Sequence, residues 1–212
     1  MKVAIGIPTF NRSHIVEMHA RSLSASRLGP DTIVIVIDDA STEYDIEFLK
    51  SIFPSRSDIR RRAKHSGGAD LAIRDLMEQL LATDADALML LDSDMLVTEN
   101  FLEVGISLLQ ESDGIISLFN TPTHPSFDSR GPFVLKRTIG SAGSLWRRDV
   151  AEKTLAGVAP GKGWDWRSLE PPELERPSRR LASTQRDNHR IERILDQELR
   201  GRQFLRREAM QE

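Results

Sequence analysis

The sequence predicts an α/β protein in which helices cover both faces of a doubly wound, mostly parallel sheet and a helical arm follows at the C-terminus. Short aliphatic, β-branched runs alternate with helical patterns along the chain, which is the rhythm of parallel βαβ units. The run at 87–91 is apolar throughout, as expected of a strand buried on both faces. Each run ends in polar residues, so one edge of the sheet is expected to carry the functional side chains.

The individual elements follow from the spacing of the apolar residues. Strands are expected at 3–7, 33–37, 87–91 and 114–119, with an extended element over 133–145. Helices are expected at 13–27, 43–53, 69–82 and 98–110. Ser13 and Thr98 are expected to cap the first and the last of these helices. The segment 120–131 contains prolines and few aliphatic residues, so it is expected to be a loop that leaves the sheet.

The composition describes an ordinary globular protein of 212 residues with 39% hydrophobic residues and a net charge of −3. Because basic and acidic residues balance and aromatic residues are few, a nucleic-acid polymer is not expected as a partner. The chain has no cysteine, which excludes disulfides and thiolate metal sites. The first residues are expected to form a strand and lack the long apolar stretch of a signal peptide, and no segment has the roughly 20 apolar residues of a membrane span. A cytoplasmic location is therefore expected.

The C-terminal segment has a different composition from the rest of the chain. Residues 168–186 are rich in Pro, Ser, Arg and Glu and poor in apolar residues, which predicts a polar linker or arm. Beyond it, apolar residues fall on one face of an amphipathic helix over 187–212, namely Ile191, Ile194, Leu195 and Leu199. Such a helix packs on its own domain or on a second subunit, so a homo-oligomer is one expected outcome.

Polar side chains follow three of the expected strands at the same edge of the sheet. They are Pro8-Thr9-Phe10-Asn11-Arg12, Asp38-Asp39-Ala40-Ser41 and Asp92-Ser93-Asp94. The carboxyl ends of neighbouring parallel strands are where a nucleotide binds in such sheets. Asp92 and Asp94, two residues apart, offer hard oxygens to one Mg²⁺ or Mn²⁺, the kind of ion that bridges the phosphates of a nucleotide. The alternative interpretation is that these acidic residues only cap turns and helices.

Five motifs, in this order along the chain, resemble those of the family 2 glycosyltransferases, which have the GT-A fold. They are Ile-Pro-Thr-Phe-Asn-Arg at 7–12, Ile-Asp-Asp-Ala-Ser at 37–41, Leu-Asp-Ser-Asp-Met at 91–95, Gly-Ser-Ala-Gly-Ser-Leu-Trp-Arg-Arg at 140–148 and Gly-Trp-Asp-Trp at 163–166. The resemblance implies a hexosyltransferase-type enzyme that moves a sugar from a nucleotide-diphosphate donor, often a UDP-sugar, with inversion at the anomeric carbon. It also implies a divalent metal, Mn²⁺ or Mg²⁺, and a saccharide, lipid-linked or protein acceptor.

The same resemblance implies roles for individual residues. Nucleotide contacts are expected from Pro8, Thr9, Asn11, Arg12, Asp38, Asp39, Asp92 and Ser93, with Asp39 meeting the base. Metal contacts are expected from Asp92, Asp94 and His189, with Asp94 as the direct ligand. Asp165, between Trp164 and Trp166, is expected to be the general base that takes the proton from the acceptor hydroxyl. The glycines and serines of 140–144 are expected to let the backbone approach the donor sugar.

The expected organisation is a GT-A domain over 1–167, divided into a nucleotide-binding half (1–120) and an acceptor side (121–167), then the linker and the C-terminal helix. Two features depart from the family pattern. The basic and Asn-rich stretch that is usual in the family takes the form Arg-Arg-Arg-Ala-Lys-His-Ser-Gly-Gly here, at 60–68, and no apolar strand is evident beyond Arg167.

Other functions remain open from the sequence. Asp92 after a buried strand also resembles the nucleophile loop of haloacid-dehalogenase-type phosphohydrolases, although that loop normally follows the first strand. A sugar nucleotidyltransferase would carry a glycine-rich, basic loop after the first strand, where this chain has Pro8-Thr9-Phe10-Asn11-Arg12. A degenerate, non-catalytic transferase that binds nucleotide and interacts through its C-terminal helix is a third class.

Overall fold

The computed structural model of the chain describes residues 1–120, 126–136, 140–157 and 181–184. Its strands are β1 (Val3–Thr9), β2 (Ile33–Asp38), β3 (Asp58–Arg61), β4 (Ala87–Leu90), β5 (Ile115–Ser117), β6 (Ser126–Arg130), β7 (Phe133–Lys136), β8 (Ser144–Arg147) and β9 (Leu181–Thr184). Its helices are α1 (Ser13–Ser24), α2 (Ile46–Ile52), α3 (Ala69–Leu81), α4 (Phe101–Glu111) and α5 (Arg148–Gly157).

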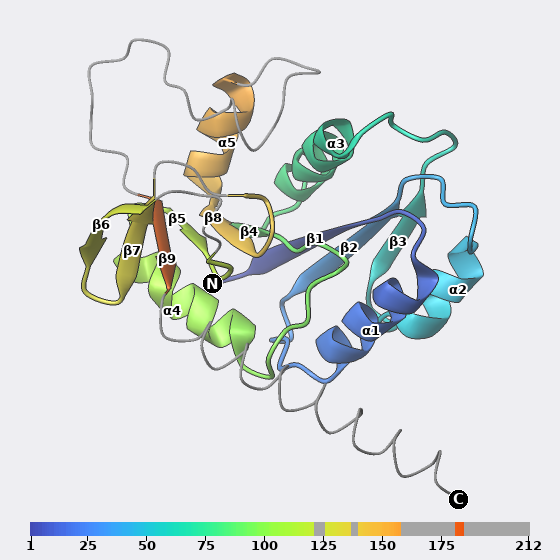
Figure 1. The fold of residues 1–212 in the computed structure, drawn as a ribbon, viewed down its shortest axis with the longest axis horizontal. Helices are drawn as coiled ribbons and strands as arrows, with labels where there is room; N and C mark the ends of the chain where they lie inside the picture. Colours follow the sequence, from blue (N-terminus) through green and yellow to red (C-terminus); the bar gives the residue numbers. More distant parts are fainter. Residues whose placement is uncertain (121–125, 137–139, 158–180, 185–212) are drawn as a thin grey trace, which may run out of the picture.

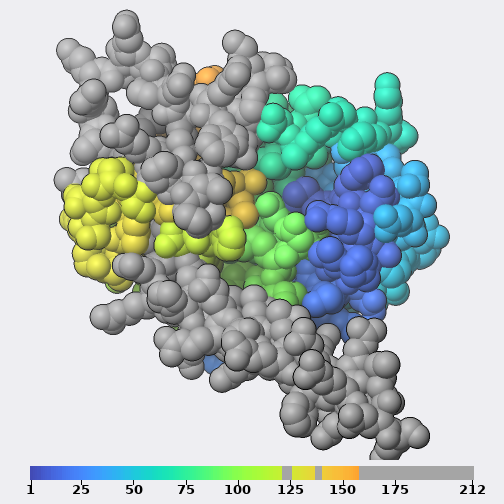
Figure 2. Space-filling model, in the orientation of Figure 1, coloured from blue at the N-terminus to red at the C-terminus, as the bar shows by residue number. Residues whose placement is uncertain are grey.

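All of these strands belong to one mixed sheet with the order β3-β2-β1-β4-β8-β5-β9-β7-β6 (Figure 1). The strands β3, β2, β1 and β4 are parallel, whereas β8 pairs antiparallel with β4 and β5, and β7 pairs antiparallel with β6 and β9. The blue-to-teal N-terminal residues and the yellow β6–β7 hairpin lie on opposite sides of the molecule (Figure 2). The predicted α/β class is confirmed.

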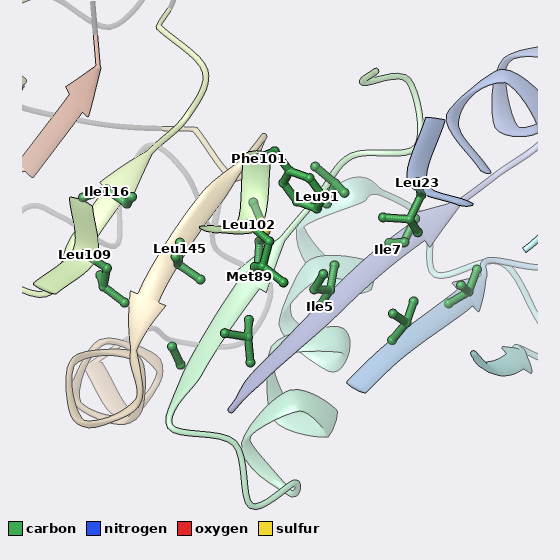
Figure 3. Close-up of a cluster of buried hydrophobic side chains, with 14 of the residues drawn as sticks. Ile5, Ile7, Leu23, Met89, Leu91, Phe101, Leu102, Leu109, Ile116 and Leu145 are labelled. Atoms are coloured by element: carbon green, nitrogen blue, oxygen red, sulfur yellow. The ribbon is translucent and has the colours of Figure 1, made fainter. Parts of the chain in front are cut away.

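Two hydrophobic clusters hold helices against the two faces of the sheet. Val3, Ile5 and Ile7 of β1 point into a cluster with residues of α1, α2 and α4, part of which is drawn in Figure 3. Ala4 of the same strand belongs to a second cluster with residues of α3 and α5. This alternation follows from the two-residue period of a strand, and it makes the sheet doubly wound.

Gly6 lies where α3 crosses β1. A Cβ atom at this position would come within 2.8 Å of Leu76 Cγ and 2.9 Å of Leu80 Cδ1, both on α3. The missing side chain therefore allows the helix to approach the central strand closely.

Several elements differ from the sequence expectations. The segment 120–131 is not only a loop, because part of it forms β6, an edge strand with all residues exposed. The extended element expected over 133–145 is two separate strands, β7 and β8, and α5 follows them unpredicted. Strand β9 lies within the range expected to be a linker, so the expectation of no strand beyond Arg167 was wrong.

The helix boundaries also differ, and both expected caps are wrong. Thr98 does not cap α4, which begins at Phe101 with Asn100 at its N-cap and no side-chain capping bond. Thr98 instead accepts a turn hydrogen bond from Phe101 N–H through its carbonyl oxygen (3.3 Å). In α2 the cap is Asp45, whose carboxylate accepts from Phe48 N–H (2.9 Å). Arg12, not Ser13, holds the N-cap position of α1.

No helix among the described residues is long and apolar enough to cross a membrane.

A cavity of about 390 Å³ lies at the amino ends of β1 and β2. It is lined among others by Met1, Val3, Leu28, Pro30, Leu102 and Ile106. This cavity is at the edge of the sheet opposite to the polar patches that the sequence singled out. The expected C-terminal helix over 187–212, and any self-association through it, lie outside the described residues.

Candidate active site

The segment that follows β1 is tied to the segment that follows β2. Asn11 N–H donates to Ser41 Oγ (2.7 Å), and the Asn11 side-chain oxygen accepts from Thr42 N–H (2.8 Å) and Glu43 N–H (3.3 Å). Asn11 and Arg12 both have left-handed backbone conformations, with φ of 49° and 56°. Such a conformation costs on the order of 1 kcal/mol for a non-glycine residue, so these hydrogen bonds hold a strained turn in place.

The strained turn directs Arg12 toward the segment that follows β4. Arg12 Nη1 lies 3.2 Å from Asp94 Oδ2, and both side chains are about half-exposed. In the turn after β4, Met95 N–H donates to the Asp92 carbonyl (3.1 Å), while Ser93 is buried and Asp92 is partly buried. Because β1 lies between β2 and β4, the three predicted polar patches meet at one edge of the sheet.

The sequence predicts a nucleotide contact for Asp38, but the structure buries this residue. Its side chain is fully buried, and Ser41 N–H donates to both carboxylate oxygens (3.2 Å each). The Ser41 hydroxyl donates to the same carboxylate, and Arg61 Nη1 lies 3.2 Å from Oδ2. The carboxylate of Asp38 therefore organises the turn after β2 from inside and has no exposed surface for a ligand.

Asp39 lies at the same edge with a side chain that is only 6% exposed. Its Oδ1 accepts from Ser66 N–H (2.9 Å) and lies 3.3 Å from Arg62 Nε. Its Oδ2 accepts from the Ser66 hydroxyl (2.6 Å) and lies 2.7 Å from His65 Nδ1. Two hydrogen bonds and two close nitrogen contacts therefore surround both oxygens of this carboxylate.

Two aromatic rings lie beside Asp39. The rings of Phe10 and His65 are stacked, with centroids 4.3 Å apart and planes 19° apart. Phe10 is 40% exposed and the His65 side chain 45% exposed. A flat, partly open stack is thereby held next to the carboxylate at the end of β2.

The buried residue His19 contacts the turn after β4, and the sequence interpretation did not single out this residue. It is fully buried on α1, and its Nδ1 lies 2.7 Å from the Met95 carbonyl oxygen, while Nε2 has no hydrogen-bond partner. Burial lowers the pKa of His19, and this effect exceeds the opposing influence of the Met95 carbonyl and the Asp94 charge. Its spacing in the sequence could have shown that His19 is buried, since it falls on the same helical face as Val16, Ala20 and Leu23.

The glycine- and serine-rich loop 140–144 lies against the same turn. Gly143 has a left-handed φ of 63°, and a Cβ atom there would come within 3.0 Å of Met95 Cε. The Gly143 carbonyl accepts from Leu118 N–H (2.9 Å). The loop and the Asp-Ser-Asp-Met turn are therefore neighbours, and glycine is required for this close approach.

The described acidic residues fit part of a divalent-metal site. The described ranges contain no group of three or more His, Cys, Asp or Glu residues suited to hold a metal. Asp92 and Asp94 supply two carboxylates, and Mg²⁺ is commonly bound through one or two carboxylates together with substrate phosphates. The expected third ligand, His189, and the expected base, Asp165, lie outside the residues that the structure describes.

The chain belongs to glycosyl transferase family 2, whose model matches residues 4–154, more than half of the sequence. The predicted membership is thus confirmed. It also disfavours the phosphohydrolase interpretation of Asp92, which follows the fourth strand of the chain and not the first. No curated protein sequence matches the chain.

Solved structures with a similar fold are GT-A glycosyltransferases, which confirms the predicted GT-A fold. S. aureus TarS has a TM-score of 0.56 at 16% identity, and the match covers 73% of this chain and 30% of that one. TarS 1–349 in complex with UDP-GlcNAc gives 0.54 at 15% identity, covering 72% and 47%. The mannosyltransferase PcManGT from Pyrobaculum calidifontis, in complex with GDP-Man and Mn²⁺, gives 0.54 at 14% identity, covering 72% and 46%. The chain therefore spans less than half the length of these neighbours.

Proposed function

We propose that the protein is a metal-dependent glycosyltransferase that moves a hexosyl group from a nucleotide-diphosphate sugar, a UDP-sugar in the first instance, to an acceptor hydroxyl with inversion. The observation that carries this proposal is the meeting of Asp39, Arg12 and Asp94 at one sheet edge of a family 2 chain. The neighbouring structures support it, because they are complexes with UDP-GlcNAc, with UDP, and with GDP-Man and Mn²⁺.

The segments after β1 and β2 would bind the nucleoside. In this proposal Pro8 and Thr9 contribute backbone at the end of β1, Asn11 keeps the turn in shape, and Asp39 faces the base. Asp38 acts indirectly, by fixing the turn that carries Asp39. Because these contacts come from neighbouring strands of a rigid sheet, the nucleoside is held without a large rearrangement of the core.

The segment after β4 would hold the diphosphate. Asp94, with Asp92 beside it, is the proposed carboxylate ligand of Mn²⁺ or Mg²⁺, and Ser93 is the proposed polar contact from the same turn. A cation bound there supplies positive charge against the charge that develops on the leaving diphosphate. Arg12 supplies a second, fixed positive charge, since its guanidinium already lies beside Asp94.

Proton transfer from the acceptor is assigned to Asp165. Inversion by in-line displacement requires a carboxylate on the side of the anomeric carbon opposite to the leaving group, where it can take the proton from the attacking hydroxyl. Saccharide, lipid-linked and protein acceptors all offer such a hydroxyl. The segments expected to select among them, 120–130 and 160–186, fall largely outside the described residues.

Calorimetry with UDP in the presence and absence of Mn²⁺ tests the donor site. Asp94→Ala is expected to weaken Mn²⁺-dependent UDP binding by about tenfold or more, because even the loss of an indirect metal-site contact costs that much. Asp31→Ala, which removes an exposed carboxylate at the opposite edge of the sheet, is the matched control. Equal UDP affinity in the wild type and Asp94→Ala would contradict the metal assignment.

Transfer is tested separately with the base variant. Asp165→Asn is expected to keep donor binding and to lose sugar transfer by about 100-fold or more, the usual contribution of a general base. A screen of UDP-, GDP-, CDP- and dTDP-sugars supplies the donor for this assay. Undiminished transfer by Asp165→Asn would remove Asp165 from the mechanism.

A further inference from the structure

The ring of His65 is held like a ligand at the proposed nucleotide site. One contact of the ring is a stack on Phe10, with the ring centroids 4.3 Å apart and the ring planes at 19° to each other. The other is at Nδ1, which lies 2.7 Å from Asp39 Oδ2 and 3.3 Å from its hydrogen-bond partner, the backbone carbonyl oxygen of Asp39. A bound nucleobase has the same arrangement, with a planar nitrogen heterocycle stacked on an aromatic ring and a ring nitrogen against a carboxylate.

We propose that His65 occupies the nucleobase position and is displaced from it by the base of an incoming nucleotide. This inference rests on the proposed function and deepens it. Two hydrogen bonds from Ser66 and the close approach of Arg62 and His65 surround both oxygens of the Asp39 carboxylate. A base can reach the carboxylate only if one of these groups moves away. His65 is the group with the most exposed side chain among those whose exposure is measured, 45% against 27% for Arg62.

The loop that carries His65 has room to release the ring. Gly67 follows with a left-handed φ of 92°, which glycine adopts readily, and a Cβ atom at Gly67 or Gly68 would meet nothing within 4 Å. Ser66 keeps its own two hydrogen bonds to Asp39. The imidazole can therefore move away while the carboxylate stays anchored through Ser66 and Arg62.

The chemistry of the exchange selects the base. Uracil, thymine and guanine carry a ring N–H on the edge that faces a pairing partner, and this group would take the place of His65 Nδ1 beside Asp39 Oδ2. Cytosine and adenine present a lone pair at the corresponding ring nitrogen, which repels a carboxylate. Uridine, thymidine and guanosine diphosphates are thus the expected ligands.

If the His65 ring and the nucleobase compete for one position, removing the ring is expected to strengthen nucleotide binding. If His65 fills the position in about 90% of molecules, the apparent Kd is raised about tenfold, and His65→Ala removes that factor. His65→Ala is therefore expected to bind UDP or GDP about five- to tenfold more tightly, with Mn²⁺ present, in isothermal titration calorimetry. His14→Ala, which removes an exposed histidine of α1, is the matched control and is expected to leave the affinity unchanged.

Two further measurements complete the test. Asp39→Asn is expected to reduce the preference for UDP over CDP, because the amide also offers a donor. In a ¹H–¹³C NMR spectrum, the His65 ring resonance, assigned by its loss in His65→Ala, is expected to move toward the position of a solvent-exposed histidine when UDP is added.

The outcomes separate the two proposals. Weaker or unchanged UDP binding in His65→Ala, or a His65 resonance that does not move, overturns the displacement by the base while leaving the glycosyltransferase proposal intact. Absence of any nucleotide-diphosphate binding by the wild type overturns the proposed function, and this inference with it.

Discussion

Asp38 and Arg61 show how a single buried charge shapes the site. The Asp38 carboxylate is fully buried and depends on Arg61 and Ser41 for compensation. Arg61→Leu is expected to lower the free energy of unfolding by about 3 kcal/mol, because it leaves the charge buried without its partner. Urea denaturation followed by circular dichroism measures the loss.

The neighbouring arginine of the same strand is the control for this prediction. Arg60 pairs with Asp58 on the surface, where both side chains are about half-exposed. Arg60→Leu is expected to cost less than about 1 kcal/mol, as exposed ion pairs usually do. Similar losses in the two variants would argue against a special role for the buried pair.

His19 makes stability depend on pH. Burial lowers the pKa of His19 in the folded protein below its ordinary value of 6.5, so the unfolded chain binds the proton more readily. The contribution of His19 to stability is therefore complete above about pH 6.5 and is lost as the pH falls through and below that value, by at most about 1.4 kcal/mol per pH unit.

Substitution of His19 isolates this effect. His19→Asn places an amide nitrogen near the position of Nδ1, keeps the hydrogen bond to the Met95 carbonyl and removes the titration. Urea denaturation between pH 5 and 8 is expected to give a flatter dependence for His19→Asn than for the wild type, whereas His14→Asn keeps the wild-type slope. Identical slopes for wild type and His19→Asn would mean that other groups cause the dependence.

The sequence predicted that three polar segments meet at one edge of the sheet, and the structure brings them together there. The segments 8–12, 38–41 and 92–94 each follow an apolar run directly, and parallel strands bring such ends together. The partners of His19 and His65 could not be predicted in this way, because Met95 and Phe10 are distant from them in the chain. The sequence predicted a nucleotide contact for Asp38 as well as for Asp39, whereas the structure buries the Asp38 carboxylate completely.

At the scale of elements, the contact between α3 and β1 depends on Gly6. Gly6→Ala is expected to lower the free energy of unfolding by about 2 kcal/mol, because the new methyl group meets Leu76 and Leu80 at less than 3.0 Å. Gly29→Ala is the control, since its Cβ would meet only Thr32 Oγ1, at 3.6 Å. Urea denaturation of both variants measures the difference, and equal stability would indicate that α3 shifts freely.

The elements that the sequence predicted are those with a strong apolar period. Strands β1, β2 and β4 and helix α3 have it, and their interiors were located correctly. Strand β3 has a single apolar residue, Ile59, and β6 is exposed throughout, so neither has a hydrophobic pattern to detect. Both are edge strands, which are held by backbone pairing and not by burial.

At the scale of the molecule, the two edges of the sheet are expected to respond differently to ligand. UDP with Mn²⁺ at about 100 times its Kd should stabilise the fold by about 2.7 kcal/mol. Hydrogen exchange is expected to slow at 9–12, 38–41 and 92–95, where the polar patches meet. Residues 28–32, beside the cavity at the amino edge, serve as the internal reference. If the ligand slowed hydrogen exchange only at 28–32, we would conclude that it binds in that cavity and not at the polar patches.

The position of β9 has a consequence for biosynthesis. This strand comes last among the described elements, yet it pairs with β5 on one side and β7 on the other. While the ribosome is still making residues 181–184, the two neighbouring strands have open hydrogen-bonding edges toward each other, and such edges invite intermolecular association. A polypeptide cut at residue 157, just beyond the span matched by the family model, would keep those edges permanently and should precipitate upon expression, whereas one extended past β9 should remain in solution.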